Sequence, residues 1–490
     1  MDEFSLYSLL SVGLLLFIQI GFGIRVLMRR QPLANTHAWL LVVLFLPLAG
    51  IFLYALIGEN RLGRRRLKRF VDTTTSLEPF HNRLWAHREQ RWDESERRFK
   101  HLAILGNNLC NSPALVGNEL RLHADAVGTL DSMITDIDAA TSHVHLLTYI
   151  FQESGHPIDV AEALIRAAHR GVECRVAVDG AGSRSFLKGS LCRKLRSSGV
   201  DVLELLPVNP LRLLVARIDL RNHRKMLVVD GTIAYTGSQN VTDDTFNVSR
   251  KSRVGPWIDA TVRIQGPSAR ALGLVFIGDW NADSPRPIRD LDRYLPVIQP
   301  PAIDASSSTS AVQVLPSGPG STPGAIQTAV LTTLYSAHEE LIMTSPYFVP
   351  DQSVVAGLAA AAQRGVDTTV ILPKHNNKRL VAAASRASFE DLLDAGVKIL
   401  EFRPGLLHAK TITVDRDIAL IGSANLDQRS FWINFEITVA VYDTDFASHL
   451  RMLQRDYANQ SDQISITSWR RRTSVQRACD NAAQLFAPLL

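Results

Sequence analysis

The sequence predicts an α/β protein in which two related domains follow an N-terminal transmembrane hairpin. Three observations indicate this class: two apolar runs near the N-terminus, a helix-and-strand pattern that occurs twice, and a length of 490 residues, too great for one ordinary hydrophobic core. The predicted parts are a transmembrane hairpin (1–60), a basic and polar linker (61–106), a first α/β domain (107–284), a Pro- and Ser-rich linker (285–310), a second α/β domain (311–446) and a C-terminal helical tail (447–490).

The hairpin rests on two apolar runs. Phe4–Ile24 covers 21 residues, enough to cross a hydrocarbon core of about 30 Å as a helix. A cleaved signal peptide is the alternative, but the run is long for one, its flank is acidic and no A-x-A site follows. Ala38–Gly58 is the second run, and we expect Pro47 to kink it. The two runs predict two antiparallel spans.

The basic residues around these runs predict an orientation. Three arginines lie in the short connection between the runs, and six cations follow the second run. The larger cluster favours the cytoplasmic side, so we expect a multi-pass membrane protein with its body in the cytoplasm. The second cluster also suits anionic lipid headgroups, although a topology signal alone explains it equally well. The residues are Arg25, Arg29 and Arg30, then Arg61, Arg64, Arg65, Arg66, Lys68 and Arg69.

Overall composition excludes several protein classes. The four cysteines are scattered without a C-x-x-C pair, which argues against a disulfide scaffold or a zinc site. The net charge of +5 is modest for this length, and basic and aromatic residues do not interleave as in nucleic-acid-binding proteins. We therefore expect no nucleic-acid partner.

The repeat extends over whole domains. The segment 168–172 matches 362–366, and each closes an Ala-rich helical pattern before a strand, at 175–178 and 368–372. The segment 195–200 likewise matches 392–397, where a glycine ends a helix before the next strand. These are successive β-α-β units in two copies.

The strongest repeat carries the candidate chemistry, because both copies fit the pattern H-x-K-x4-D-x6-G-S-x-N. Six fixed positions occur by chance in about one such chain in 10^5, so two copies exclude accident. The histidine and lysine lie two residues apart at the start of a predicted strand and project to one face. The copies are His223, Lys225, Asp230, Gly237, Ser238 and Asn240, and His408, Lys410, Asp415, Gly422, Ser423 and Asn425.

These residue types suit a phosphodiester. Its negative charge repels a nucleophile until cations neutralise it, which lysine does. An imidazole can attack phosphorus, and a second imidazole can transfer the proton of the leaving group. We expect Ser238, Asn240, Ser423 and Asn425 to add neutral donors to the phosphate. Exchange of one phosphodiester for another is nearly isoenergetic, and no H-E-x-x-H or clustered-carboxylate motif is present, so we expect neither a cofactor nor a metal.

The duplicated motif resembles that of the phospholipase D superfamily, in which two such motifs meet across a pseudo-twofold axis. The resemblance implies a pair of α-β-α sandwiches. More narrowly, the chain is similar over its whole length to the bacterial cardiolipin synthases, a family that uses phosphatidylglycerol as donor and acceptor and releases cardiolipin and glycerol. The segments that carry this resemblance are Arg29–Pro32, His37–Leu41, Leu46–Leu48, Gly58–Glu59, Ser345–Pro350 and Asn434–Glu436.

The resemblance also implies residue roles. It assigns His223 as the nucleophile that forms a phosphatidyl-histidine and His408 as acid and base, an order that the symmetry of the repeat leaves open. It counts Asp230 and Asp415 as catalytic, although acids that end a strand before a turn more often bond backbone.

Two further acids align between the copies. Asp259 and Glu436 open equivalent strands, and a catalytic imidazole needs its second ring nitrogen held. We predict that Asp259 lies near His223 and Glu436 near His408.

The copies differ by one insertion. Gly199 to His223 spans 24 residues, whereas Gly396 to His408 spans 12. The extra segment, about Leu206–Leu220, mixes apolar and basic residues and suits a lipid gate beside the site, or a helix packed on the second domain.

Three function classes are compatible with these features: phosphatidyl transfer between membrane lipids, hydrolysis of phosphodiesters by the same fold, and a catalytically silent membrane scaffold. The hairpin favours transfer, because a site confined to the bilayer meets a high concentration of lipid acceptor. A scaffold has no need of paired His and Lys. Oligomeric state, acyl preference and the use of phosphatidylethanolamine as donor stay open.

Overall fold

The computed structural model describes residues 3–29, 33–59, 61–85, 97–208, 217–246, 248, 254–295 and 310–487. The chain forms two compact units. The N-terminal unit comprises Met1–Arg65 with Val208–Leu220, and the body comprises Arg66–Pro207 with Arg221–Leu490.

The described part of the N-terminal unit contains the helices α1, α2 and α3 and the first residues of α4 (Arg64–Trp85). α1 (Glu3–Met28) includes Leu10–Met28, which is long and apolar enough to cross a membrane. The second predicted span is broken into two shorter apolar helices, α2 (Leu33–Phe45) and α3 (Pro47–Ile57). The break falls at Pro47, as predicted, because proline has no N–H for the preceding turn and its ring clashes there. The predicted hairpin is therefore only partly confirmed: the first span is continuous and the second is not.

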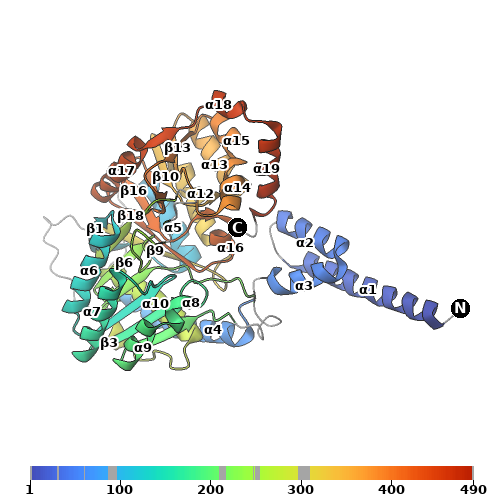
Figure 1. Ribbon diagram of the computed structural model, residues 1–490. Helices are drawn as coiled ribbons and strands as arrows, with labels where there is room; N and C mark the ends of the chain where they lie inside the picture. The colour runs from blue at the N-terminus through green and yellow to red at the C-terminus, as the bar shows by residue number, and fades with distance from the viewer. Residues whose placement is uncertain are drawn as a thin grey trace. The chain divides into compact units, whose positions relative to one another are not determined.

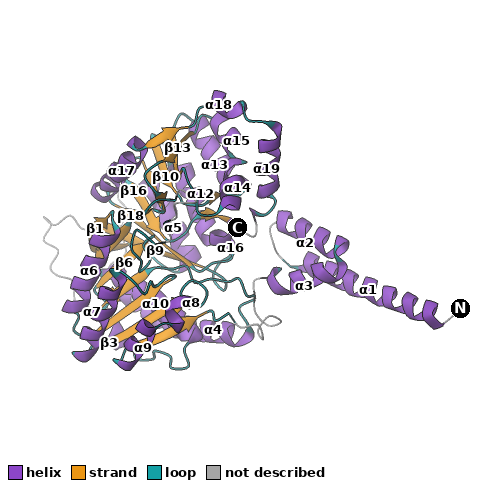
Figure 2. Cartoon of the chain, viewed as in Figure 1, coloured by secondary structure: helices purple, strands orange, loops and turns teal. Residues whose placement is uncertain are grey.

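The body is built on one mixed sheet of fifteen strands (Figure 2). From one edge, the first half contributes β4 (Asp201–Leu205), β3 (Glu173–Asp179), β2 (His143–Thr148), β5 (Met226–Val229), β6 (Ile233–Gly237), β8 (Thr261–Gln265) and β1 (Leu115–His123). The second half continues with β9 (Ser310–Ser317), β18 (Glu436–Tyr442), β16 (Ile418–Gly422), β15 (Thr411–Val414), β10 (Glu340–Thr344), β12 (Asp367–Pro373), β13 (Lys398–Phe402) and β19 (Ser461–Gln463).

The two halves are related by a pseudo-twofold axis. Read outward from the centre, the order β1-β8-β6-β5-β2-β3-β4 of the first half has its counterpart in β9-β18-β16-β15-β10-β12-β13 of the second. The axis passes between β1 and β9, which pair antiparallel. Figure 1 separates the halves by colour, with the first in cyan to yellow-green and the second in orange to red. The predicted tandem fold is confirmed, and its two sheets are fused edge to edge.

Helices cover both faces of the sheet. One face packs on α10 (Pro267–Asp283) and α17 (Thr444–Asn459), which share one apolar core with strands of both halves. The opposite face of the first half carries α6 (Ala126–Ala139), α7 (Pro157–His169), α8 (Arg184–Lys188) and α9 (Ser190–Ser197). The corresponding face of the second half carries α5 (Arg97–Cys110), α12 (Ala325–Ser336), α13 (Gln352–Gln363) and α15 (Phe389–Asp394). These are the α-β-α layers that the resemblance implied.

Several elements cross or fill the predicted boundaries. The predicted linker 61–106 contains α4 (Arg64–Trp85) and most of α5, and Phe99 and Leu102 of α5 are buried in the core of the second half. The predicted linker 285–310 contains α11 (Leu291–Tyr294), and its residues 296–309 lie outside the described residues. The boundary placed at 446 falls inside α17.

The C-terminal segment packs on the body. It holds α18 (Ile466–Arg470) and α19 (Ser474–Gln484), and α19 lies against α14 (Arg379–Arg386). Asp480 of α19 is buried and paired with Arg386 at 2.8 Å. The remaining short elements are β7 (Trp257–Ile258), β11 (Phe348–Val349), β14 (Leu406–Leu407), β17 (Leu426–Asp427) and α16 (Gln428–Trp432).

Candidate active site

The two histidines lie at the pseudo-twofold axis, each on a segment that pairs with the other half of the body. Before β5, the His223 N–H donates to the Phe435 carbonyl at 2.9 Å. Before β15, β14 pairs in parallel with β7, and the His408 N–H donates to the Ile258 carbonyl at 2.8 Å. Phe435 and Ile258 immediately precede Glu436 and Asp259. Backbone pairing across the axis therefore places the acid of one half beside the histidine of the other.

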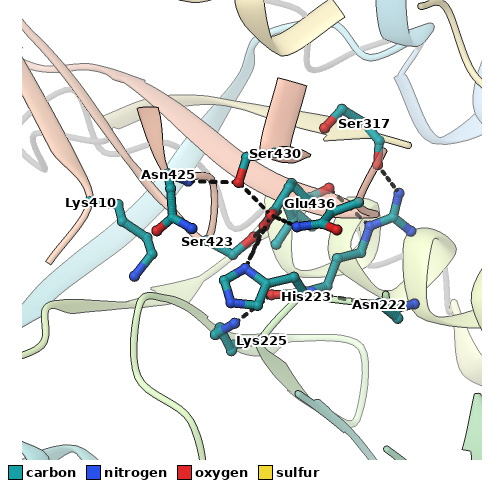
Figure 3. Close-up of polar contacts among 12 residues, drawn as sticks. Asn222, His223, Lys225, Ser317, Lys410, Ser423, Asn425, Ser430 and Glu436 are labelled. Carbon is teal, nitrogen blue, oxygen red and sulfur yellow. Dashed lines mark hydrogen bonds and ion pairs between the residues drawn. The ribbon is translucent and has the colours of Figure 1, made fainter. Parts of the chain in front are cut away.

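Each imidazole is held by a carboxylate of the opposite half. Nδ1 of His223 donates to Glu436 at 3.0 Å, as Figure 3 shows. Nδ1 of His408 donates to Asp259 at 2.6 Å. The predicted pairing, Asp259 with His223 and Glu436 with His408, is wrong. The two acids occupy equivalent positions, as the repeat indicated, but alignment within a repeat says nothing about exchange across a twofold axis.

The two lysines share the site with the histidines. Nζ of Lys225 donates to the His223 carbonyl at 2.6 Å, and Nζ of Lys410 donates to the His408 carbonyl at 2.7 Å. In Figure 3, Lys225 and Lys410 approach His223 from different sides. Both lysines are almost fully buried, with 3% and 4% of their surface exposed. Two ammonium groups in one buried site attract an anion strongly.

Burial lowers the pKa of both imidazoles. Desolvation outweighs the attraction of Glu436 and brings the pKa of His223 to about 4. Desolvation together with the Lys410 charge brings the pKa of His408 to about 3, although Asp259 acts in the opposite direction. Without an anion in the site, both rings are therefore neutral at pH 7, and each keeps Nε2 as a free base because Nδ1 holds the proton.

The other charges in the site shift as well. Burial lowers the pKa of Lys410 to about 8, against the attraction of Asp259 and Glu436, and lowers the pKa of Lys225 well below its ordinary value. Burial raises the pKa of the Asp259 and Glu436 carboxyls, but their histidine and lysine neighbours outweigh burial and hold both pKa values below the ordinary range. The two acids are ionised at neutral pH.

The serine hydroxyls of the motif donate hydrogen bonds to the two carboxylates. Ser238 Oγ donates to Asp259 at 2.6 Å, and Ser423 Oγ donates to Glu436 at 2.6 Å. Each Oγ also accepts a backbone N–H of the adjacent strand, from Ala260 or Ile437. The sequence predicted these hydroxyls as phosphate donors, but a buried carboxylate without donors is costly and takes the nearest ones.

The asparagines of the motif lie beside the lysines. Asn240 and Lys225 line one small cavity, and Asn425 and Lys410 line its counterpart. Asn240 Oδ1 accepts the Ile150 N–H at 3.2 Å, so its amide nitrogen faces the other way. Each asparagine therefore lies beside the lysine of its own motif.

The acids of the motif lie away from this cluster. Asp230 accepts the N–H groups of Thr141, Ser142 and His143, each at 2.8 Å. Asp415 accepts those of His338, Glu339 and Glu340 in the second half. Because β5 and β15 separate them from the lysines, Asp230 and Asp415 fix the far ends of these strands. These contacts favour the supporting role that the turn positions of the two acids indicated, and a catalytic role for either acid stays a prediction.

The glycine of each motif is required by close backbone packing. A Cβ on Gly237 would lie 2.3 Å from the Ala260 carbonyl oxygen, and one on Gly422 would lie 2.3 Å from that of Ile437. The absent side chain lets the next strand approach, and that strand carries the acid into the site.

Two aromatic residues contact the histidines and were missed from the sequence. The Tyr149 ring lies edge-on to the His223 ring at 5.0 Å, and Nζ of Lys225 lies 5.4 Å from its centre. The Trp257 ring lies 4.4 Å from the His408 ring. Both stand outside the repeated motif, so internal alignment gave no signal. The signal that could have found them is their place in the sequence: Tyr149 directly follows β2, and Trp257 precedes Asp259 by two residues.

Arg224, between His223 and Lys225, points away from the site and joins the two halves. Its guanidinium donates to both oxygens of Asp279 at 2.8 Å, to the Glu436 carbonyl at 2.9 Å and to the Ser317 carbonyl at 2.9 Å. Asp279 is 1% exposed and also accepts from Asn222. The bonds to the Glu436 and Ser317 carbonyls lock the His223 segment onto the second half, and the ion pair with Asp279 holds the guanidinium in place for them.

The predicted gate is described only at its ends. Residues 209–216 of the insertion Leu206–Leu220 lie outside the described residues. At one end, the Leu206 N–H donates to Asp283 at 3.1 Å, within the body. At the other, the Arg217 N–H donates to the Arg61 carbonyl at 2.9 Å, within the N-terminal unit.

Comparison with known proteins places this site in a family. The family description "Cardiolipin synthase, PLD-like domain" matches residues 133–253 and 330–456, one half-site in each match. The description "Phospholipase_D-nuclease N-terminal" matches residues 17–59. The chain is 39% identical over 474 residues to cardiolipin synthase A of Shigella flexneri and 40% identical over 475 residues to that of Erwinia tasmaniensis, with 96% of each chain covered.

A solved structure shows the same fold. Phosphatidylserine synthase of Haemophilus influenzae Rd KW20 superimposes with a TM-score of 0.57 at 13% identity, covering 81% of this chain and all of that one. Together with the end-to-end similarity to curated relatives, the matches to both halves lead to one assignment. The chain belongs to the family of phospholipase D-like cardiolipin synthases.

Proposed function

We propose that this protein is a phosphatidyltransferase that joins two phosphatidylglycerol molecules into cardiolipin and releases glycerol. The observation that carries the proposal is the pair of imidazoles, each held at Nδ1 by an ionised acid of the opposite half, beside two buried lysines. Such a site needs an anionic substrate and offers one base on each side of it. The curated relatives carry the name cardiolipin synthase A.

In the first step, we assign the attack to Nε2 of His223. A new N–P bond forms as the bond between phosphorus and the departing glycerol oxygen breaks, and Nε2 of His408 gives that oxygen its proton. The bound phosphate anion raises the pKa of His408 from its low value in the empty site, because the negative charge favours the imidazolium. Lys225 and Lys410 balance the charge of the phosphoryl oxygens, with Asn240 and Asn425 beside them.

In the second step, the roles reverse. Neutral His408 takes the proton of a glycerol hydroxyl of the second phosphatidylglycerol, whose oxygen forms the new P–O bond as the N–P bond breaks. Cardiolipin leaves and His223 is restored. Asp259 and Glu436 orient the rings, and Ser238 and Ser423 hold these carboxylates. The exchange conserves the number of phosphodiester bonds, so the reaction is reversible and requires no cofactor.

The two halves and the N-terminal unit divide this work. Residues 107–284 and 311–446 each supply one His-Lys pair, and residues 1–60 anchor the enzyme in the bacterial inner membrane. The basic residues that follow α3 hold the body on the cytoplasmic side and attract anionic lipids. The partners are phosphatidylglycerol, cardiolipin and an anionic bilayer surface, without nucleic acid.

The test is product analysis with purified protein in phosphatidylglycerol vesicles. We expect cardiolipin and glycerol in equal amounts, with little phosphatidic acid. The second candidate, a phospholipase D, uses water as acceptor. Formation of phosphatidic acid without cardiolipin would therefore show that the protein is a hydrolase and not a transferase. A variant with His223→Ala and His408→Ala is the blank for both activities.

A further inference from the structure

The C-terminal end of α3 lies beside the C-terminal end of α1. Glu59, two residues after α3, bonds Arg25 at 2.6 and 2.9 Å and lies 3.3 Å from Arg29. In two antiparallel spans, residue 59 would leave the membrane beside the N-terminal end of α1, about 30 Å from Arg25. The contact between Glu59 and the two arginines is incompatible with that arrangement.

The reversal occurs at the proline break. A Cβ on Gly50 would lie 2.2 Å from the Val42 carbonyl oxygen, although eight residues of straight helix separate their ends by about 12 Å. α2 and α3 therefore fold back on each other around Leu46 and Pro47. Their 13 and 11 residues correspond to about 20 and 17 Å, too short for either to span a bilayer alone.

The turn lies against the middle of α1. Nε2 of Gln19 donates to the Val43 carbonyl at 3.1 Å and to the Leu44 carbonyl at 3.2 Å. The Val43 carbonyl would normally accept from residue 47, which is proline and has no N–H. Unpaired backbone groups are costly in hydrocarbon, so the buried Gln19 side chain stabilises the turn by donating to the two carbonyls at the proline break.

The depth of the turn follows from α1. Gln19 precedes Met28, the last residue of α1, by nine residues, or about 14 Å. This is half of a hydrocarbon core of about 30 Å. Figure 1 shows the N-terminal half of α1 continuing past α2 and α3.

We propose that α2 and α3 form a re-entrant hairpin that enters one leaflet, turns at mid-depth and leaves on the face it entered, so that the chain crosses the bilayer once, through α1. Its outer surface is apolar and exposed to lipid. The most exposed of these side chains are Leu41, Leu44, Phe45, Leu46, Leu48 and Phe52.

Charge placement agrees with a single crossing. Two spans would leave Arg25, Arg29 and Arg30 on the face opposite the later basic cluster. With the re-entrant hairpin, both clusters lie on the face where the chain enters the body, and the acidic N-terminus lies on the other face. All of these basic residues then lie on one side of the membrane, as the preference of basic residues for the cytoplasmic side predicts.

The first test is accessibility to a membrane-impermeant maleimide in spheroplasts and in inverted vesicles. Cys479 is exposed and reports the side of the body. Gln31→Cys in a Cys479→Ser background reports the connection between α1 and α2, and a cysteine inserted after Met1 in the same background reports the N-terminus. We expect Gln31→Cys and Cys479 to react from one face and the N-terminal cysteine from the other. Reaction of Gln31→Cys from the face opposite Cys479 would overturn the proposal.

The second test is a disulfide cross-link in native membranes. Arg25→Cys with Glu59→Cys is expected to cross-link on oxidation, because these side chains are in contact. Tyr7→Cys with Glu59→Cys is the matched control, since two antiparallel spans would bring that pair together and keep the first pair apart. Cross-linking of the control pair alone would contradict the re-entrant hairpin. Neither test measures lipid products, so failure here leaves the proposed activity to be judged by its own assay.

Discussion

Glu436 accepts the Nδ1 proton of His223 at 3.0 Å although the two residues are 213 positions apart and belong to different halves of the repeat. Asp259 and His408 repeat the relationship at 2.6 Å. Neither half therefore supplies both members of either of these two pairs. The site exists only when both halves are folded against each other.

The crossed pairing predicts specific energetic coupling. In a double-mutant cycle on the free energy of unfolding, His223→Ala with Glu436→Gln should show a coupling of about 0.5–3 kcal/mol, because removal of either partner leaves the other buried without it. His223→Ala with Asp259→Asn should be additive to within about 0.5 kcal/mol. Denaturant unfolding in detergent measures both cycles. Larger coupling to Asp259 than to Glu436 would contradict the crossed arrangement.

The assignment of His223 as nucleophile predicts different behaviour of the two histidine variants with an activated substrate. The p-nitrophenyl ester of phosphatidic acid has a leaving group that needs no protonation, so His408→Ala should release one equivalent of nitrophenolate and retain labelled phosphatidyl-enzyme. His223→Ala should give neither. On phosphatidylglycerol, both variants should lose activity by at least about 10³-fold, from loss of the acid or of the nucleophile. A burst from His223→Ala alone would reverse the two roles.

The low pKa of Lys410 predicts an alkaline limb in the pH profile. Burial places this pKa at about 8, so the ammonium is charged below pH 8 and loses its charge as the pH rises through that value. The kcat/KM on phosphatidylglycerol, which reports the free enzyme, should fall above pH 8. Lys410→Arg stays charged and should have a lower but flatter profile up to about pH 10. An unchanged limb in Lys410→Arg would assign it to another group.

The ion pair of Arg224 and Asp279 predicts a large effect on stability. Arg224→Met leaves the Asp279 carboxylate buried without its cation and should cost about 3–5 kcal/mol of unfolding free energy. Arg224→Met with Asp279→Leu should recover part of this loss. Arg286→Met, at an ion pair whose arginine is 80% exposed, is the matched control and should cost less than about 1 kcal/mol. Equal effects of the two single variants would contradict the proposed role in joining the halves.

The sequence by itself determined the fold class, the strands around the motif and the histidines, lysines and two acids that meet in the candidate site, but not the neighbouring Tyr149 and Trp257. The strands expected after Lys225 and Lys410 are β5 and β15, and those expected to open at Asp259 and Glu436 are β8 and β18, of which β8 begins two residues later. These features are local: alternation of apolar residues, turn glycines and fixed spacing are properties of neighbouring residues, and the repeat displays each of them twice.

Only the tertiary structure decided which groups meet. The exchange of Asp259 and Glu436 across the axis, the donation of Ser238 to a carboxylate and the return of Glu59 to Arg25 all join residues that are distant in sequence or compete for one partner. Their geometry follows from strand pairing between halves and from the cost of leaving a buried carboxylate or carbonyl without a donor. Hydrophobic patterning predicts neither the strand pairing nor the hydrogen-bond partners, because it indicates which face of an element is buried and not which other element covers it.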